Sequence, residues 1–435
     1  MSATQETTVR YGLSILNRVR AGKTRSWLAA AALGAVAMLG VPGARGDVAF
    51  SWGYNNVGQV GDGTATNQYA PVAMSVLTNG VTAVAGGGYH SLALQSGAVY
   101  ATGYNGLGQF GDGTTVNSAI PVAPFGLTAG VTAIAAGPYH SLAIRKNGAI
   151  AWGLNSSGQL GNGTLINSST PVSVTGLGSG VTAVAGGGVN VAGLAEYFSL
   201  AIQNGKVFAW GDNGQGQLGD GTTVGQSAPV AVGGLGTGVT TIAAGGDHGL
   251  AVKGGALFAW GGNGNGQLGD GTTVDHPVAT AVPSLTSGVT AIAGGSFHSL
   301  VVQKGNVYSF GYNNAGQLGD GTTTNSSTPI LVDPVDLNSI VAVAAASLSS
   351  YALSSDGSLW VWGYGGLGEL GIGVAGTYST PQHLLAPVGY AFTSIDADAN
   401  GNQAVATLVA VPEPASLSLI LLAGGTLLAR RRRMV

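Results

Sequence analysis

Residues 260–272 read Trp-Gly-Gly-Asn-Gly-Asn-Gly-Gln-Leu-Gly-Asp-Gly-Thr, and close variants of this stretch recur along the chain. Each copy begins at a pair formed by an aromatic residue, or its substitute, and a glycine. Successive pairs are separated by 50, 50, 58, 50, 50 and 52 residues. The seven pairs are Trp52-Gly53, Thr102-Gly103, Trp152-Gly153, Trp210-Gly211, Trp260-Gly261, Phe310-Gly311 and Trp362-Gly363. A fixed period near 50 residues indicates a repeat architecture.

The rest of each repeat is rich in strand and turn residues. A Pro-Val pair, a Val- and Ala-rich run such as 81–87 and a His-Ser-Leu-Ala-Leu segment such as 90–94 follow one another. Short apolar or alternating segments separated by Gly, Asn and Asp predict up to four short strands per repeat. Four-stranded sheets repeated around an axis form a β-propeller. We therefore predict an all-β, seven-bladed propeller over residues 47–411, with blades of about 52 residues.

The two ends of this region predict how the ring closes. Residues 47–51 form a lone strand that enters Trp52-Gly53 without a His-Ser segment before it. Residues 392–408 resemble the strands that precede such a pair, and no pair follows them. We expect the first strand to complete the seventh sheet, which removes the free edges of the ring in a chain that has no Cys.

The patterns Trp-Gly-x-Asn-x-x-Gly-Gln-Leu-Gly-x-Gly and Gly-x-x-His-Ser-Leu-Ala-Leu resemble the repeats of the regulator of chromosome condensation family, whose members are seven-bladed propellers. The resemblance covers essentially all of 47–411. The repeat histidine is found at His90, His140, His248 and His298. Phe198 and Ser349 take its place in two repeats, and the seventh equivalent lies within 400–403. The last repeat diverges most, with Gly365, Glu369 and Ile372 where the pattern has Asn, Gln and Asp.

Charge is distributed unevenly along the chain. Only 8% of the 435 residues are charged, and the formal net charge is −3. Residues 47–411 contain five basic and 16 acidic residues, a net charge of −11. Such a domain repels nucleic acid phosphates and anionic lipid, so no nucleic acid partner is expected.

The N-terminal segment, residues 1–46, has the features of a secretory signal. Basic residues between 18 and 25 precede an apolar run over 27–41, and small residues precede a plausible cleavage site before Asp47. The alternative is a membrane helix that is retained, for which the run is short.

The C-terminal segment, residues 412–435, resembles the PEP-CTERM sorting signal of Gram-negative envelope proteins. It combines Pro412, Glu413 and Pro414, an apolar run over 415–429, and the basic tail of Arg430, Arg431, Arg432 and Arg433. The resemblance implies passage through the inner membrane, processing by a membrane sortase, and a final location at the cell surface, in the outer envelope or outside the cell. A permanent tail anchor is the alternative.

Two repeated polar positions invite a metal hypothesis. The four repeat histidines lie on separate blades without a matched carboxylate, so we expect them to tie neighbouring blades together by hydrogen bonds. The Gly-Asp-Gly-Thr loops each offer one carboxylate, whereas Ca²⁺ takes six to eight oxygen ligands. Asp-Gly at a tight turn explains these loops without an ion. We therefore predict no metal and no cofactor, and the five repeat tryptophans, Trp52, Trp152, Trp210, Trp260 and Trp362, are expected to be structural.

No catalytic motif stands out in residues 47–411. The only two glutamates are Glu196 and Glu369, and the two close aspartates Asp396 and Asp398 fit one face of a strand. Gly-x-Gly-x-x-Gly at 214–219 and 264–269 precedes no predicted helix, so a phosphate-binding loop is not expected. We predict that the protein is not an enzyme.

Variable positions inside the otherwise regular repeat are the candidate binding residues. Aromatic residues are frequent after the Trp-Gly pair and before the repeat histidine, and tyrosine is enriched at binding interfaces. The candidates are Tyr54, Tyr104, Tyr312, Tyr364, Tyr89, Tyr139 and Phe297. Packing between blades is the alternative role for these side chains. An eight-residue excess in one repeat, 189–196, predicts a loop that projects from one face of the ring.

The sequence thus favours an exported, monomeric propeller that binds a protein or a polysaccharide at the bacterial envelope. One alternative is an inhibitor similar to the secreted propellers that inhibit β-lactamases. The resemblance also implies guanine-nucleotide exchange and chromatin binding, which the predicted export and the acidic domain disfavour. An uncharacterised hydrolase is the remaining alternative.

Overall fold

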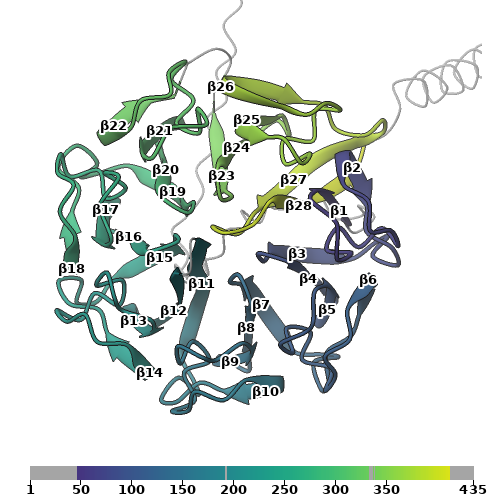
Figure 1. Ribbon diagram of the computed structural model, residues 1–435, viewed down its shortest axis with the longest axis horizontal. Coiled ribbons are helices and arrows are strands. Elements are labelled where there is room, and N and C mark those ends of the chain that lie inside the picture. The colour runs from purple at the N-terminus through teal and green to yellow at the C-terminus, as the bar shows by residue number, and fades with distance from the viewer. Residues whose placement is uncertain (1–46, 192–193, 333–336, 338, 412–435) are drawn as a thin grey trace, which may run out of the picture. The chain divides into compact units, whose positions relative to one another are not determined.

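The computed structural model describes residues 47–191, 194–332, 337 and 339–411. In these residues the chain forms 28 strands, arranged as seven four-stranded antiparallel sheets around a central axis (Figure 1). The prediction of an all-β, seven-bladed propeller is confirmed. Among the described residues, no helix is long and apolar enough to cross a membrane. The two flanking segments predicted as sorting signals, 1–46 and 412–435, lie outside the described residues.

Each of the first six blades takes four consecutive strands, numbered here in chain order from the axis outward. Blade 1 contains β3 (Val81–Gly86), β4 (His90–Gln95), β5 (Ala98–Gly103) and β6 (Ser118–Val122). Blade 2 contains β7 (Val131–Ala136), β8 (His140–Arg145), β9 (Gly148–Gly153) and β10 (Ser168–Ser173). Blade 3 contains β11 (Val181–Val191), β12 (Leu194–Gln203), β13 (Lys206–Gly211) and β14 (Gln226–Ala231).

The next three blades repeat the order. Blade 4 contains β15 (Val239–Ala244), β16 (His248–Lys253), β17 (Ala256–Gly261) and β18 (His276–Ala281). Blade 5 contains β19 (Val289–Gly294), β20 (His298–Gln303), β21 (Asn306–Gly311) and β22 (Ser326–Leu331). Blade 6 contains β23 (Ile340–Ala345), β24 (Ser349–Ser354), β25 (Leu359–Gly365) and β26 (Gly376–Leu384).

Blade 7 combines strands from both ends of the described chain. Its inner strands are β27 (Tyr390–Asp396) and β28 (Gln403–Ala410), and its outer strands are β1 (Val48–Gly53) and β2 (Gln68–Ala73). Strand β1 pairs antiparallel with β28 from Val48 opposite Leu408 to Gly53 opposite Gln403. The predicted closure is confirmed, and β2 accompanies β1, so two N-terminal strands complete the sheet.

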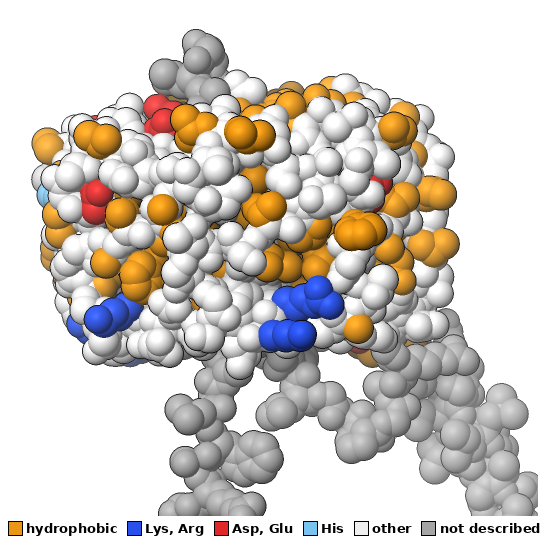
Figure 2. Space-filling model, turned by 90° about the horizontal axis from the view of Figure 1, so that it is seen from below, with side chains coloured by type: hydrophobic (Ala, Val, Ile, Leu, Met, Phe, Trp, Pro, Cys, Tyr) orange, Lys and Arg blue, Asp and Glu red, His pale blue; other side chains and the backbone are white. Residues whose placement is uncertain are grey.

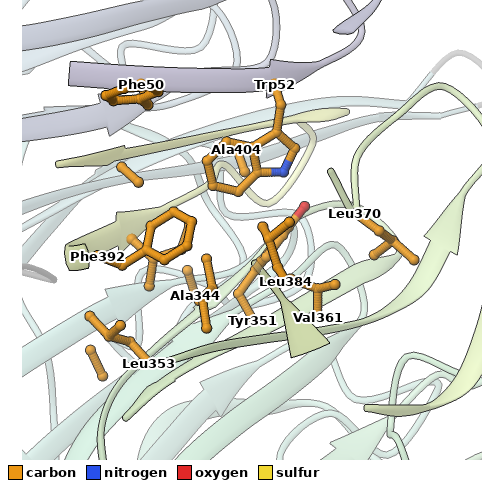
Figure 3. Close-up of a cluster of buried hydrophobic side chains, with 14 of the residues drawn as sticks. Phe50, Trp52, Ala344, Tyr351, Leu353, Val361, Leu370, Leu384, Phe392 and Ala404 are labelled. Atoms are coloured by element: carbon orange, nitrogen blue, oxygen red, sulfur yellow. The ribbon is translucent and has the colours of Figure 1, made fainter. Parts of the chain in front are cut away.

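A hydrophobic cluster packs blade 7 against blade 6 where the ring closes (Figure 3). Trp52 and Phe392 meet edge to face with ring centroids 6.2 Å apart, although one belongs to the first strand and the other to β27. Tyr351 of β24 is fully buried in the same cluster. Burying aromatic side chains of this size contributes a few kcal/mol each, so the closure is held by packing as well as by the strand ladder.

In five of the seven blades, the repeat tryptophan joins the blade to the one before it. The Trp152 indole N–H donates to the carbonyl of Gln109 at 2.7 Å, and the Ser141 hydroxyl donates to the same carbonyl at 2.9 Å. All five tryptophans are fully buried, and each makes this bond to the Gln or Glu of the preceding blade. Thr102, which replaces Trp, donates instead to the carbonyl of Gly58 at 3.0 Å.

The repeat histidines are fully buried and also bridge blades. His90 Nε2 lies 2.9 Å from the Ser141 hydroxyl of the next blade. The same contact joins His140 to Ser199, His248 to Ser299 and His298 to Ser350. Burial lowers the pKa of His90, His140 and His298 to about 3, so these rings are neutral at physiological pH.

The three remaining blade boundaries lack the histidine. Gln403 lies opposite Gly53, which identifies it as the seventh equivalent of the histidine, and its Nε2 donates to the Ser91 hydroxyl at 2.9 Å. Where Phe198 replaces histidine, the next blade has Gly249 in place of serine. Where Ser349 replaces it, the next blade has Ala404. The Ser349 hydroxyl is instead satisfied within its own blade, where it donates to the Tyr364 carbonyl at 2.6 Å.

The Gly-Asp-Gly-Thr loops also form inter-blade contacts. Asp62 Oδ1 accepts from the backbone N–H and the hydroxyl of Thr64, which shapes the turn. Gly63, with φ of 90°, donates its N–H to the carbonyl of Ala119 on the next blade. Equivalent bonds recur at all seven boundaries, including the one from Gly373 to Tyr69 that crosses the closure. These geometries support the turn interpretation of the loops.

Candidate functional site

The two ends of the ring differ in charge. At one end of the ring, a turn connects the first strand of each blade to the second. This end carries the tyrosines, and we call it the tyrosine face. All five described Lys and Arg residues lie at the other end, in or beside the turns between second and third strands: Arg145, Lys146, Lys206, Lys253 and Lys304. In side view, basic side chains gather along one rim of the ring (Figure 2). Among the described residues, the tyrosine face therefore carries no Lys or Arg.

Four tyrosines from three blades form one cluster on the tyrosine face. Tyr89 of blade 1 and Tyr139 of blade 2 stack with centroids 5.4 Å apart and an angle of 22° between their planes. Tyr104 meets Tyr139 edge to face at 6.3 Å, and Tyr197 of blade 3 does so at 5.6 Å. Because Tyr89, Tyr104 and Tyr139 are only half-buried, they offer ring faces and edges to a ligand.

A surface pocket of about 240 Å³ opens at this cluster. It is lined by Tyr89, Tyr104 and Tyr139 together with Asn56 and Val57 of blade 7. Its walls thus combine three aromatic rings with one exposed amide. Concave sites with apolar walls and a few polar groups are the usual form of ligand pockets.

The insertion in blade 3 extends the hairpin of β11 and β12 over the tyrosine face. Tyr197 pairs with Gly188 and Glu196 with Val189, so the extra residues continue the ladder. The Asn190 N–H donates to Asn400 Oδ1 of blade 7 at 3.3 Å, and Asn190 Nδ2 donates to the Tyr139 hydroxyl at 3.4 Å. Because blades 3 and 7 are not neighbours, the hairpin reaches across the axis of the ring (Figure 1).

Acidic side chains lie on the side of the hairpin away from the tyrosines. Glu196 and Tyr197 are consecutive residues of a strand and so point to opposite sides of it. Burial, and then the nearby Asp212 and Asp247, raise the pKa of Glu196 to about 7. Gln217 Nε2 donates to Asp212 at 2.9 Å and Gln267 Nε2 to Asp247 at 3.1 Å. These aspartates therefore also satisfy buried amides of the repeat.

The structure separates the predicted aromatic residues into two groups. Tyr89, Tyr104 and Tyr139 come together at the pocket, and they contact one another across blades on the surface. The other four predicted residues are half-buried at separate positions around the face, outside the cluster: Tyr54, Tyr312, Tyr364 and Phe297. Sequence analysis missed Tyr197 because the insertion disguised its equivalence to Tyr89 and Tyr139, and it had no signal for Asn56.

The repeat histidines take no part in this site. Each is buried between blades, and no group of three or more His, Asp or Glu side chains in the described part of the chain is arranged to hold a metal ion.

Comparison with known proteins agrees with the observed architecture. A family model described as the regulator of chromosome condensation (RCC1) repeat matches residues 47–94, 96–144, 148–193, 204–252, 254–302 and 304–353. A second model of the same repeat matches 131–159 and 289–317. No curated protein matches the chain significantly.

Solved structures with the same fold share little sequence with this chain. Human WBSCR16 is 23% identical, with a TM-score of 0.73 over 84% of this chain and 100% of that one. Prp20p from Saccharomyces cerevisiae, a structure reported with its binding to Gsp1p and histones, is 22% identical, with a TM-score of 0.72 over 88% of this chain and 95% of that one.

Proposed function

Because the chain belongs to the regulator of chromosome condensation repeat family, we propose that it is a non-enzymatic binding propeller whose tyrosine face recognises a protein or polysaccharide partner. The observation that carries this proposal is the pocket between Tyr89, Tyr104 and Tyr139. Tyrosine gives a large contact area at a low cost in side-chain entropy, and its hydroxyl adds a hydrogen bond.

The charge of the face limits the partner. Glu196 of the hairpin lies near Asp212 and Asp247, and every described Lys and Arg is at the opposite end of the ring. An anionic ligand would meet like charge here, so the partner surface is neutral or basic.

Export is part of the same proposal and rests on the sequence of the flanking segments. Residues 1–46 would direct secretion, and residues 412–435 would act as a PEP-CTERM signal read by a membrane sortase, placing the propeller at the cell surface or outside the cell. Asp47 and Val411 are the described residues that adjoin these two segments. Both lie at the end of the ring opposite the tyrosines. Attachment through residues 412–435 would therefore leave the tyrosine face free.

Binding can be tested with two matched pairs of substitutions. Purified protein is applied to immobilised envelope polysaccharides and to separated envelope proteins, and the Kd of each ligand retained is measured. Tyr104→Ala with Tyr139→Ala removes two walls of the pocket and should weaken binding more than about tenfold, as expected for clustered aromatic contacts.

Tyr312→Ala with Tyr364→Ala is the control, because both tyrosines occupy the repeat position of Tyr104 but lie outside the cluster. Binding by the control pair should be unchanged. The proposal is contradicted if both pairs of substitutions weaken binding equally. It is also contradicted if neither the polysaccharides nor the envelope proteins contain a ligand that the protein retains.

A further inference from the structure

A cavity of about 110 Å³ lies on the axis of the ring. The first strands of all seven blades line it, mostly with Ala, Val and Ile side chains. The cavity is large enough for several water molecules or for one partly hydrated ion.

Asp396 and Asp398 are the only ionisable residues that line this cavity. The Gly86 N–H donates to Asp396 Oδ2 at 3.0 Å, and the Asn400 N–H donates to Asp398 Oδ1 at 2.8 Å. Asp398 is 3% exposed, and its Oδ2 has no hydrogen-bond partner. Two carboxylates thus line one cavity that has no Lys, Arg or His on its walls, and one of their oxygens has no hydrogen-bond partner.

Burial disfavours the charged form of both groups. It raises the pKa of Asp396 to about 7, and that of Asp398 well above its usual value, where the neighbouring Asp396 adds to the effect. Either a proton or a bound cation must therefore compensate this pair. Tyr197 is the other titratable group that interacts with Asp398, and its own pKa is raised, so it stays neutral.

The walls of the cavity also supply uncharged oxygen ligands. The first strand of each blade is the inner edge of its sheet, so about half of its carbonyl groups have no partner within the sheet and are available as ligands. Oxygen ligands without nitrogen or sulfur favour hard cations such as Ca²⁺ and Mg²⁺ over Zn²⁺. Ca²⁺ tolerates the irregular geometry that backbone carbonyls and water provide better than Mg²⁺ does.

We propose that the axial cavity binds one Ca²⁺ through Asp396 and Asp398, with backbone carbonyls and water completing its shell. The inference concerns a site that the sequence analysis, which predicted no metal, did not find. It stands independently of the proposed function of the tyrosine face.

The ion would stabilise the loop between β27 and β28, which lines the cavity with Ala397, Asp398 and Ala399. In this loop, the Ala399 carbonyl accepts from the Ser296 hydroxyl of blade 5, and the Gly401 carbonyl accepts from the Ser347 N–H of blade 6. Asn400 accepts from the Asn190 N–H of the blade 3 hairpin. Ca²⁺ at Asp398 would therefore strengthen contacts among four blades at the point where the ring is closed.

The test is calcium titration of chelator-treated full-length protein at about pH 8, above the raised pKa of Asp396. Saturating CaCl₂ should raise Tm by about 4 °C, as expected when the free ion exceeds its Kd about a hundredfold. Calorimetric titration should give a stoichiometry of one ion per chain.

Asp398→Asn and Asp396→Asn test the two ligands separately, and each should weaken binding at least tenfold while keeping the shape of the side chain. Asp356→Asn is the control, because Asp356 lies in an exposed turn at the other end of the ring, and it should respond like the wild type. Far-UV circular dichroism verifies that the variants fold. An unchanged calcium response in both cavity variants, the absence of any Tm rise in the wild type, or a larger rise with MgCl₂ would overturn the proposal.

Discussion

Two blade boundaries, between blades 1 and 2 and between blades 3 and 4, fill the same buried position with different side chains. At the first, His90 reaches Ser141, and both side chains are fully buried. At the second, the equivalent residues are Phe198 and Gly249, and no hydrogen bond is needed. A Cβ atom at Gly249 would lie 2.4 Å from the Trp260 ring, so this boundary has no room for a larger residue in its present packing.

The comparison shows that the two positions act as a pair. A buried hydroxyl or imidazole without a partner costs about 1–3 kcal/mol, whereas replacing both partners by apolar groups of suitable shape is nearly neutral. Gln403 and Ser91 form a polar pair of the first kind, whereas Ser349 beside Ala404 donates its hydroxyl to the Tyr364 carbonyl of its own blade. Seven similar repeats thus tolerate different residues at a boundary, provided that both sides of it change together.

The largest loss of stability is expected at blade 7, where β1 pairs with β28 although no turn connects the two strands. Deleting residues 47–53 removes β1, together with Trp52 from the closing cluster. The ring should then stay open and the protein should aggregate, because β28 is left with an unpaired edge. Size-exclusion chromatography and thermal unfolding give the answer, and a soluble truncated protein that melts cooperatively would contradict the role of the closure.

A smaller effect is expected when the first boundary is converted to the second type. His90→Phe alone should destabilise the protein by about 1–3 kcal/mol, since a larger ring is forced against Ser141. Adding Ser141→Gly should recover part of this loss, with a coupling energy of about 0.5–3 kcal/mol in a double-mutant cycle measured by denaturant unfolding. Additive losses would show that the two positions are independent.

The smallest effect concerns pH. The pKa of His90 is lowered from 6.5 to about 3, so the unfolded chain takes up a proton on acidification while the folded one does not. Its neutral form is therefore a source of stability that is complete above about pH 6.5 and is lost as the pH falls toward 3.

The paired variant His90→Phe, Ser141→Gly lacks this proton uptake. Between about pH 7 and 5.5 it should lose about 1 kcal/mol less stability than the wild type. Comparing the two proteins cancels the opposite trend of buried carboxyls such as Glu369, whose pKa is raised to about 7. Parallel pH profiles would show that His90 titrates alike in the folded and unfolded states.

The period of the repeat made the fold predictable from sequence. Trp-Gly pairs about 50 residues apart and turn residues between short apolar runs were sufficient, because each blade is built by local hydrogen bonding and buries its faces against neighbours of the same kind. The lone first strand was likewise sufficient to predict the closure, although β2 was not foreseen as its companion.

The candidate site was predictable only in part. The variable positions identified Tyr89, Tyr104 and Tyr139, because aromatic residues stand out in a regular repeat. The same rule also selected Tyr312 and Tyr364, which the ring places away from the cluster. Position within a repeat defines the face of the ring on which a side chain lies, but the contact between two such side chains depends on the neighbouring blades.

The sequence by itself determined the number of blades, the turns that separate their strands and the side chains that face each blade boundary, because these follow from short-range periodicity. Only the tertiary structure decided that an insertion in blade 3 reaches Asn400 of blade 7, that Tyr197 joins the tyrosine cluster, and that Asp396 and Asp398 line one cavity on the axis. The physical reason is that ring closure pairs residues as far apart in sequence as Val48 and Leu408, and no local pattern records those contacts.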